Sequence, residues 1–207
     1  MRAETVKRST RLLSIAIALL TLAFLGAKAQ ASLFDYQATL SGPNESPPNA
    51  SPGTGFADVV YDDVAHTLSV NVTFSGLTGT TTASHIHAAT TLPGTGTAGV
   101  ATTTPTFAGF PLGVTSGTYN NVLDLTQASS YNPSYVSANG GTTASAEAAL
   151  VAALAADKAY LNIHSTTFGG GEIRGFLVLV PEPSSLALLA LTGAAGLGWR
   201  ARRRIAR

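Results

Sequence analysis

The chain contains no cysteine. Disulfides, Cys-ligated zinc, iron–sulfur clusters and thiol catalysis are therefore excluded. Charge is also scarce, because only 11% of the 207 residues are charged and the formal net charge is +1, against about 25% charged residues in typical soluble domains. This balance argues against a coiled coil, a charged disordered tail and a nucleic-acid-binding protein, which needs a basic stripe. The length suits one ordinary domain or two small ones.

Residues 1–31 have the pattern of a secretory signal peptide. Basic residues precede an apolar run over 12–26, and small residues follow that form two overlapping A-x-A cleavage sites, ending at Ala29 and at Ala31. The alternative is a permanent membrane anchor, but the run is short of the roughly 20 apolar residues that a spanning helix needs. We expect this segment to be removed.

Residues 181–207 combine three features in series. Pro181, Glu182 and Pro183 come first, an apolar run occupies 186–199, and five arginines follow. The two prolines end the preceding strand and keep the backbone extended. As a helix the run would span only about 21 Å, and the arginines favour the cytoplasmic side of a membrane. A simple C-terminal anchor, the alternative, would not require Pro-Glu-Pro at this place.

This series resembles the PEP-CTERM sorting signal of Gram-negative bacteria. The resemblance implies recognition by an exosortase, cleavage near the Pro-Glu-Pro motif, a transient inner-membrane intermediate held by the C-terminal helix, and delivery to the cell surface or the extracellular space. Between the two end segments, residues 32–180 carry two basic and nine acidic side chains, a net charge of −7. Binding to nucleic acid is therefore not expected for the mature protein.

Residues 32–180 form the predicted mature domain, and short alternating patterns dominate it. The clearest is 67–74, where Leu68, Val70, Val72 and Phe74 alternate with polar residues. Strand-like segments lie at 33–40, 55–61, 67–74, 84–88, 118–125, 159–164 and 172–180. Short strands broken by Gly, Pro and Asn favour an all-β sandwich or barrel. The Ala/Leu-rich stretch 144–158 predicts one short inserted helix, and 90–105 predicts a loop over one end.

Three of the four histidines lie in strand-like segments. Residues two apart in a strand share a face, so His85 and His87 point away from the core if Ile86 points into it. The same alternation places His164, together with Asn162, on the outer face of its strand.

On the last strand, the alternation places Glu172 and Arg174 outside. If the strands are neighbours, these polar groups converge, and His85, His87, His164 and Glu172 would form a ligand set for copper or zinc, because neutral imidazole suits both ions. The alternative is that the histidines bond to loops while Glu172 and Arg174 form an exposed ion pair. His66 is predicted to be a solvated turn residue. The sequence requires no cofactor, and copper or zinc is the candidate only if these residues act as ligands.

Five short motifs occur in order along this domain. They are Leu-Ser-Gly-Pro-Asn-Glu-Ser-Pro-Pro at 40–48, Phe-Ser-Gly-Leu at 74–77, Ala-Ser-His-Ile-His at 83–87, Tyr-Leu-Asn-Ile-His at 160–164 and Gly-Gly-Glu-Ile-Arg-Gly at 170–175. Over residues 33–178 the chain resembles the CHRD domain, a family named from chordin and common in exported bacterial proteins. Ser84 replaces the family's usual residue before the His-Ile-His, and 143–158 is an insertion. The resemblance implies an immunoglobulin-like or related β-barrel fold and no established enzymatic activity.

The expected architecture is thus all-β: an immunoglobulin-like or superoxide-dismutase-like (SOD-like) sandwich or barrel with one short inserted helix, flanked by N- and C-terminal apolar targeting helices. Four histidines are too few for the two metal sites of copper–zinc superoxide dismutase itself. No G-x-S-x-G nucleophile motif supports a hydrolase. We expect an exported, non-enzymatic surface or matrix protein, with exopolysaccharide or other matrix proteins as the partners that the sorting signal implies. The alternative is a copper- or zinc-binding module, with a redox role left open.

Overall fold

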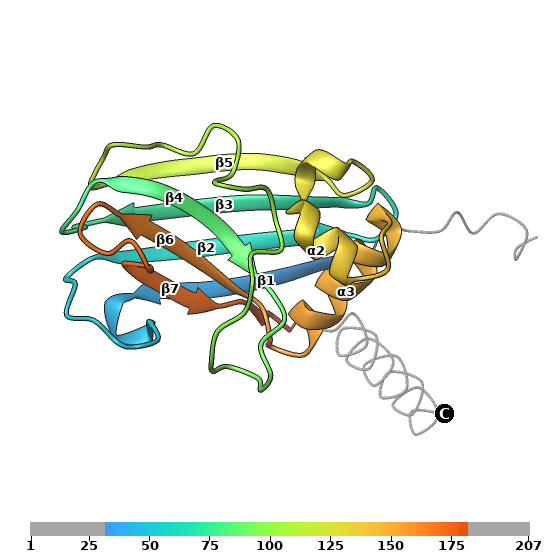
Figure 1. Cartoon of the computed structure of the whole chain (residues 1–207), viewed down its shortest axis with the longest axis horizontal. Coiled ribbons are helices and arrows are strands. Elements are labelled where there is room, and N and C mark those ends of the chain that lie inside the picture. The colour runs from blue at the N-terminus through green and yellow to red at the C-terminus, as the bar shows by residue number, and fades with distance from the viewer. Residues whose placement is uncertain (1–31, 182–207) are drawn as a thin grey trace, which may run out of the picture.

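The computed structural model describes residues 32–181. Figure 1 shows a curled antiparallel sheet with two short helices packed at one end. The predicted cleavage sites at Ala29 and Ala31, the motif residues Glu182 and Pro183 and both predicted targeting helices lie outside the described residues. Within residues 32–181, no helix combines the length and the apolar character needed to cross a membrane.

A single sheet contains all the strands of this part of the chain. Its order is β4-β6-β7-β1-β2-β3-β5, and β8 pairs with β1. The strands are β1 (Leu33–Ser41), β2 (Thr54–Asp62), β3 (Thr67–Ser75), β4 (Thr81–His87), β5 (Gly117–Asp124), β6 (Tyr160–Ser165), β7 (Ile173–Phe176) and β8 (Val178–Leu179). Each coincides with a segment of alternating or apolar residues, so the mostly-β prediction is confirmed.

The short strand β7 connects a long meander of strands to a smaller group of strands in the sheet. β1, β2 and β3 pair over their whole lengths, from Leu33 opposite Asp62 to Ser41 opposite Thr54 in the first hairpin. β7 pairs with β6 on one side and meets β1 through Arg174 opposite Ser41 on the other. The result is one half-barrel of antiparallel strands. The immunoglobulin-like or SOD-like topology stays a prediction.

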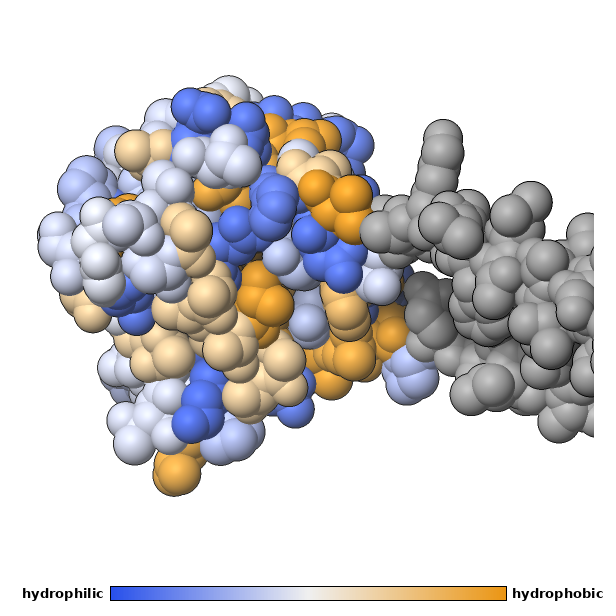
Figure 2. All heavy atoms as spheres, turned by 90° about the vertical axis from the view of Figure 1, so that its right-hand side faces the viewer, coloured by the Kyte–Doolittle hydropathy of each residue, from blue (hydrophilic) through white to orange (hydrophobic). Residues whose placement is uncertain are grey.

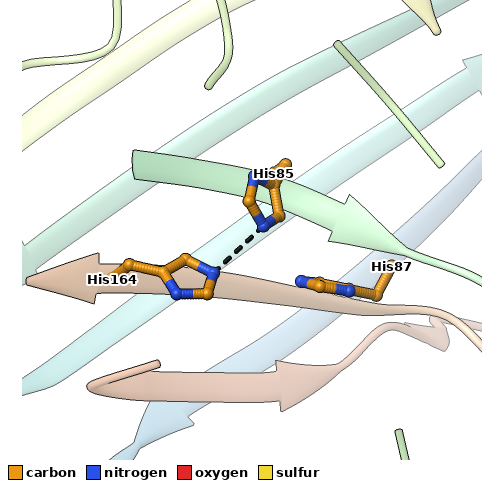
Figure 3. Close-up of side chains that lie close together, drawn as sticks. All are labelled: His85, His87 and His164. Carbon is orange, nitrogen blue, oxygen red and sulfur yellow. Dashed lines mark hydrogen bonds between the residues drawn. The ribbon is translucent and has the colours of Figure 1, made fainter. Parts of the chain in front are cut away.

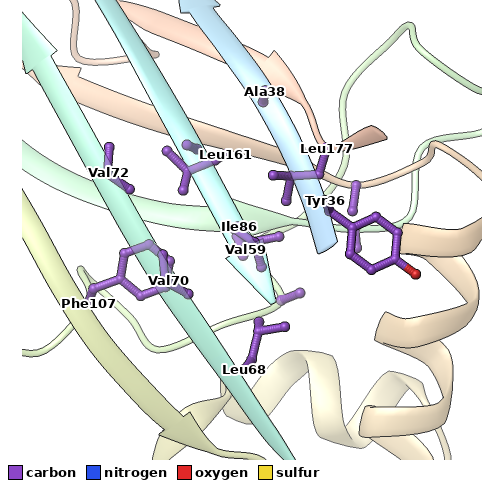
Figure 4. Close-up of a cluster of buried hydrophobic side chains, with 14 of the residues drawn as sticks. Tyr36, Ala38, Val59, Leu68, Val70, Val72, Ile86, Phe107, Leu161 and Leu177 are labelled. Atoms are coloured by element: carbon purple, nitrogen blue, oxygen red, sulfur yellow. The ribbon is translucent and has the colours of Figure 1, made fainter. Parts of the chain in front are cut away.

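The core lies inside this curl and draws on both halves of the sheet (Figure 4). From β3, Leu68 and Val70 are fully buried, and from β4 and β6, Ile86 and Leu161 are fully buried as well. Burying an aliphatic side chain of this size contributes about 1.5–3 kcal/mol relative to leaving it exposed. The alternation that predicted the inner faces of these strands is therefore confirmed.

Two α-helices cover one end of the sheet (Figure 1). The predicted insertion forms α3 (Thr143–Ala155). Thr142 is the N-cap of this helix and forms a capping box with Ser145, and the helix buries Leu150 and Leu154. The short helix α2 (Pro133–Ala138) is not among the elements expected from the sequence, although Asn132 caps it and proline stands at its first position, the usual start signal of a helix. Two single 3₁₀ turns, η1 (Gly42–Asn44) and η2 (Ala128–Ser130), complete the regular structure of this region.

Candidate functional site

Three histidines meet on the outer face of β4 and β6 (Figure 3). The two strands are antiparallel neighbours, with Ala83 opposite His164 and His85 opposite Asn162. The Nε2 atoms of His85 and His164 are 3.0 Å apart, and one ring nitrogen from each of His85, His87 and His164 lies within 4.8 Å of the others. The predicted convergence of these three side chains is therefore seen in the structure.

Loops hold each imidazole from the opposite side. The Nδ1 atom of His85 lies 3.1 Å from the carbonyl oxygen of Pro105, and that of His87 lies 2.8 Å from the oxygen of Ala98. The Nδ1 atom of His164 lies 3.0 Å from the carbonyl oxygen of Gly169. Because a carbonyl oxygen can only accept, each Nδ1 carries the proton and donates it. In the neutral rings, each Nε2 is then left with its lone pair.

Burial is the main electrostatic influence on the three rings. It lowers the pKa of His85 to about 3, aided by the neighbouring His87 and His164 and opposed by the bond to Pro105. Burial also lowers the pKa of His87 to about 4, against the bond to the Ala98 carbonyl. The pKa of His164 is lowered for the same reason. All three imidazoles are therefore neutral at neutral pH.

The histidine side chains point away from the core, as predicted, but they are not exposed to solvent. Ile86 points into the core as expected, but His85 is only 7% exposed and His87 only 9% exposed. The reason is that the long connection between β4 and β5 and the turn after β6 pass over this face and supply the three carbonyls. The interpretation as residues bonded to loops and the interpretation as ligands are thus compatible, because the loops bind Nδ1 and leave Nε2 free.

Glu172 does not join the histidines, and its predicted exposure is wrong. It is 0% exposed, and its carboxylate accepts hydrogen bonds from the hydroxyl of Ser51 at 2.6 Å, from the amide of Thr78 and from the amide of Gly79 at 3.2 Å. Burial by itself raises its pKa, but the hydrogen bonds from Ser165, Ser51 and the two amides outweigh burial and hold the pKa below its usual value. Glu172 therefore fastens the turn between β3 and β4 to the start of β7.

Arg174 is also buried, at 4% exposed, and not part of an exposed ion pair. Its guanidinium lies over the ring of Tyr160, 4.7 Å from the ring centre, and donates to the carbonyls of Asn44 and Gly96. The His87 ring stacks on the same Tyr160, with centroids 4.6 Å apart. A polar layer thus extends from the histidines across Tyr160 to Arg174.

The acidic neighbour of Arg174 is Glu45, which is not among the site residues predicted from the sequence. Its Oε2 atom is 3.7 Å from Nε of Arg174. Burial nevertheless dominates over the attraction to Arg174 and the bond from the Ser46 amide, and it raises the pKa of Glu45 to about 7. Glu45 and Arg174 line a pocket of about 570 Å³. The Gly-Pro-Asn-Glu motif was visible in the sequence, but only the fold shows that it reaches β7.

The fourth histidine lies apart from the cluster. His66 occupies the turn between β2 and β3 with a φ of 54°, and its side chain is 51% exposed, as the turn prediction required. It is not merely solvated, because its Nδ1 lies 2.9 Å from the carboxylate of Glu147 on α3. That hydrogen bond and the charge of Glu147 raise the pKa of His66.

Chemically, the cluster of His85, His87 and His164 offers three neutral nitrogen donors in a small, mostly buried space. Among the residues from 32 to 181 these three form the group of ligating side chains close enough together to hold a metal ion, and the group contains no carboxylate.

Comparison with known proteins confirms both resemblances. Residues 179–204 match the PEP-CTERM protein-sorting motif, which indicates an exported protein that an exosortase processes and that reaches the cell surface or the extracellular space. No curated protein and no solved structure matches the chain significantly. Residues 36–177, more than half of the chain, match the CHRD domain. The chain therefore belongs to the CHRD domain family.

Proposed function

We propose that this protein is a non-enzymatic component of the cell surface or extracellular matrix, released from its membrane intermediate by an exosortase. The observation that carries the proposal is the sorting motif, which begins at residue 179 directly behind the family domain. Pro181 follows Val180, whose amide donates to the carbonyl of Asp35 on β1. The cleavage motif is therefore attached to the folded body without an intervening linker.

The surface of the domain favours partners rich in hydroxyl groups. Of the two basic residues in this part of the chain, Arg174 is buried and Lys158 is half-buried. Of the nine acidic residues, Asp124 is exposed and five others are half-buried. Seen from the end that carries α2 and α3, hydrophilic and apolar side chains are intermingled (Figure 2). Such a surface repels polyanions and suits hydrogen bonding to an uncharged exopolysaccharide or to another matrix protein.

Processing tests the first half of this proposal. In the native host, Pro181→Ala combined with Pro183→Ala should leave a longer, cell-retained form, whereas the wild-type chain is shortened and released. Pro93→Ala is the matched control because Pro93 is also an exposed proline but lies in a turn outside the motif. Immunoblots of cell and medium fractions measure the outcome. Normal shortening and release of the double variant would contradict exosortase processing at this motif.

Matrix association tests the second half. The released form, incubated with extracellular polysaccharide isolated from the same cells, should sediment with it, and added salt should change the bound fraction little because hydrogen bonds rather than ion pairs provide the contact. A protein that stays in the supernatant at every salt concentration would refute the matrix role.

A further inference from the structure

The Nε2 atoms of His85 and His164 face each other at 3.0 Å. In the neutral rings the proton of each imidazole is on Nδ1, so we infer that no hydrogen lies between the two Nε2 atoms. Both Nδ1 atoms already donate to carbonyls, so each Nε2 presents a lone pair. Two lone pairs at this distance repel each other. A cation between the two nitrogens removes the repulsion. A proton shared by the two rings would also remove it, but it would place a positive imidazolium in a mostly buried site that contains no carboxylate to balance the charge, which is unfavourable.

His87 supplies the second, independent observation. Its side chain is buried, and its Nε2 atom has no hydrogen-bond partner. A buried imidazole nitrogen without a partner is unfavourable, since a buried polar atom normally forms a hydrogen bond. The ring is not free to turn away, because Nδ1 is bonded to the Ala98 carbonyl and the ring stacks on Tyr160.

We propose that His85, His87 and His164 bind one late transition-metal ion, Zn²⁺ or Cu²⁺, through their three Nε2 atoms. Histidine ligands in proteins almost always donate their other ring N–H to a carbonyl, carboxylate or water, which fixes the ring orientation. Here all three rings have such a carbonyl, from Ala98 and Pro105 in the connection between β4 and β5 and from Gly169 in the turn after β6.

The distances fit this assignment with small side-chain adjustments. Two nitrogens that are each about 2.0–2.1 Å from a tetrahedral zinc ion are about 3.3 Å apart. The pair at 3.0 Å needs almost no change, and the widest separation, at most 4.8 Å, requires small shifts of the side chains toward the ion. A set of three neutral nitrogens without thiolate or carboxylate favours Zn²⁺ and Cu²⁺ over Mg²⁺ and Ca²⁺, which prefer oxygen ligands. The fourth position stays open to water or to an external ligand on the side of His164, the most accessible of the three.

Metal titration of the full-length chain tests the site. The protein is stripped with EDTA and titrated separately with Zn²⁺ and with Cu²⁺, and bound metal is counted by elemental analysis. We expect one ion per chain in each arm, tighter for copper as the usual order of divalent ions requires. His85→Gln and His164→Gln should each weaken binding at least about 100-fold, because loss of a ligand exceeds the 10–100-fold effect of losing an outer-shell partner.

His66→Gln is the matched control, since it removes the one histidine outside the cluster and should change the affinity less than about 3-fold, within the scatter of surface substitutions. Circular dichroism is used to check that each variant is folded. His164→Gln is the most informative variant because His164 is only half-buried, so its replacement disturbs the fold least. Electron paramagnetic resonance of the Cu²⁺ form should show coupling to three imidazole nitrogens, reduced to two in His164→Gln.

The proposal is overturned if the wild-type chain takes up neither ion, or if the folded His164→Gln variant binds as tightly as His66→Gln. Exosortase processing is measured in cells and does not enter this titration, so failure of either proposal is distinguishable from failure of the other.

Discussion

Replacing Glu172 by glutamine should destabilise the fold more than any surface substitution, although the two side chains have nearly the same shape. The carboxylate is fully buried, and the hydrogen bonds that it accepts include those from the hydroxyl of Ser51 and the amides of Thr78 and Gly79. A hydrogen bond to a charged group contributes about 1.5–3 kcal/mol, against about 0.5–1.5 kcal/mol for a neutral one. In addition, the side-chain NH₂ group of glutamine would face one of the hydroxyl or amide donors that now bond to the carboxylate.

Weakening three bonds by about 1 kcal/mol each gives an expected loss of about 3 kcal/mol in the free energy of unfolding. For a domain of this size, that loss lowers the melting temperature by about 6–12 °C. Thermal and urea unfolding followed by circular dichroism measure it. Because the pKa of Glu172 is held below its ordinary 4.5, this stabilisation is present above pH 4.5 and is lost as the pH falls through the lower pKa of the folded state. The difference between wild type and variant should therefore shrink in acid.

Asp124→Asn is the matched control for Glu172→Gln. Asp124 also accepts two hydrogen bonds, from the amide and hydroxyl of Thr126, but it is exposed, so water replaces what the substitution removes. We expect a loss of less than about 0.5 kcal/mol. Equal losses for Glu172→Gln and Asp124→Asn would refute the view that Glu172 fastens the β3–β4 turn to β7.

Two further predictions concern the sheet and its end. In an NMR titration, the pKa of His66 should lie above 6.5 in the wild type and fall back toward 6.5 in Glu147→Gln. Because the pKa of His66 is raised in the folded state, the stabilisation by this pair is present below pH 6.5 and disappears as the pH rises through the folded-state pKa. An unchanged pKa of His66 in the variant would contradict the contact. Gly175→Ala should lower the free energy of unfolding by about 1–3 kcal/mol, because a Cβ at this position would stand 2.4 Å from the Thr39 carbonyl oxygen. The control Gly99→Ala has open space around the added Cβ and should be nearly neutral in urea unfolding. Similar losses in both variants would argue against a close approach of β7 to β1.

Alternation in the sequence predicted the faces of the strands well, because it follows directly from strand geometry. Ile86 and Leu161 were expected inside and are fully buried. Whether the opposite face is open to water depends on where loops run, and the carbonyls of Ala98 and Pro105 come from a stretch with no periodic pattern. The sequence could therefore place His85 and His87 on one face but could not show that this face is covered.

Glu172 was misplaced for a local reason. The predicted strand began at 172, whereas β7 begins at Ile173. Gly171 has a φ of 133°, a conformation suited to glycine, and turns the chain immediately before Glu172. Strand alternation does not extend across such a turn, so Glu172 points toward Ser51 and the β3–β4 turn instead of toward His164.

Because β7 lies between β6 and β1, the sheet can be completed only after nearly all of the domain has been synthesised. β1, β2, β3 and β5 are neighbours in the sheet and all end before residue 125. β4 precedes β5 in the chain, but its partner β6 comes only at residues 160–165, and the two groups are joined through β7 at residues 173–176. Until then β1 has an unpaired edge open to wrong partners. The histidine cluster needs β4, β6 and the turn at Gly169 together, so it too assembles late. Synthesis of the sorting motif therefore follows within a few residues of the strand that completes the fold.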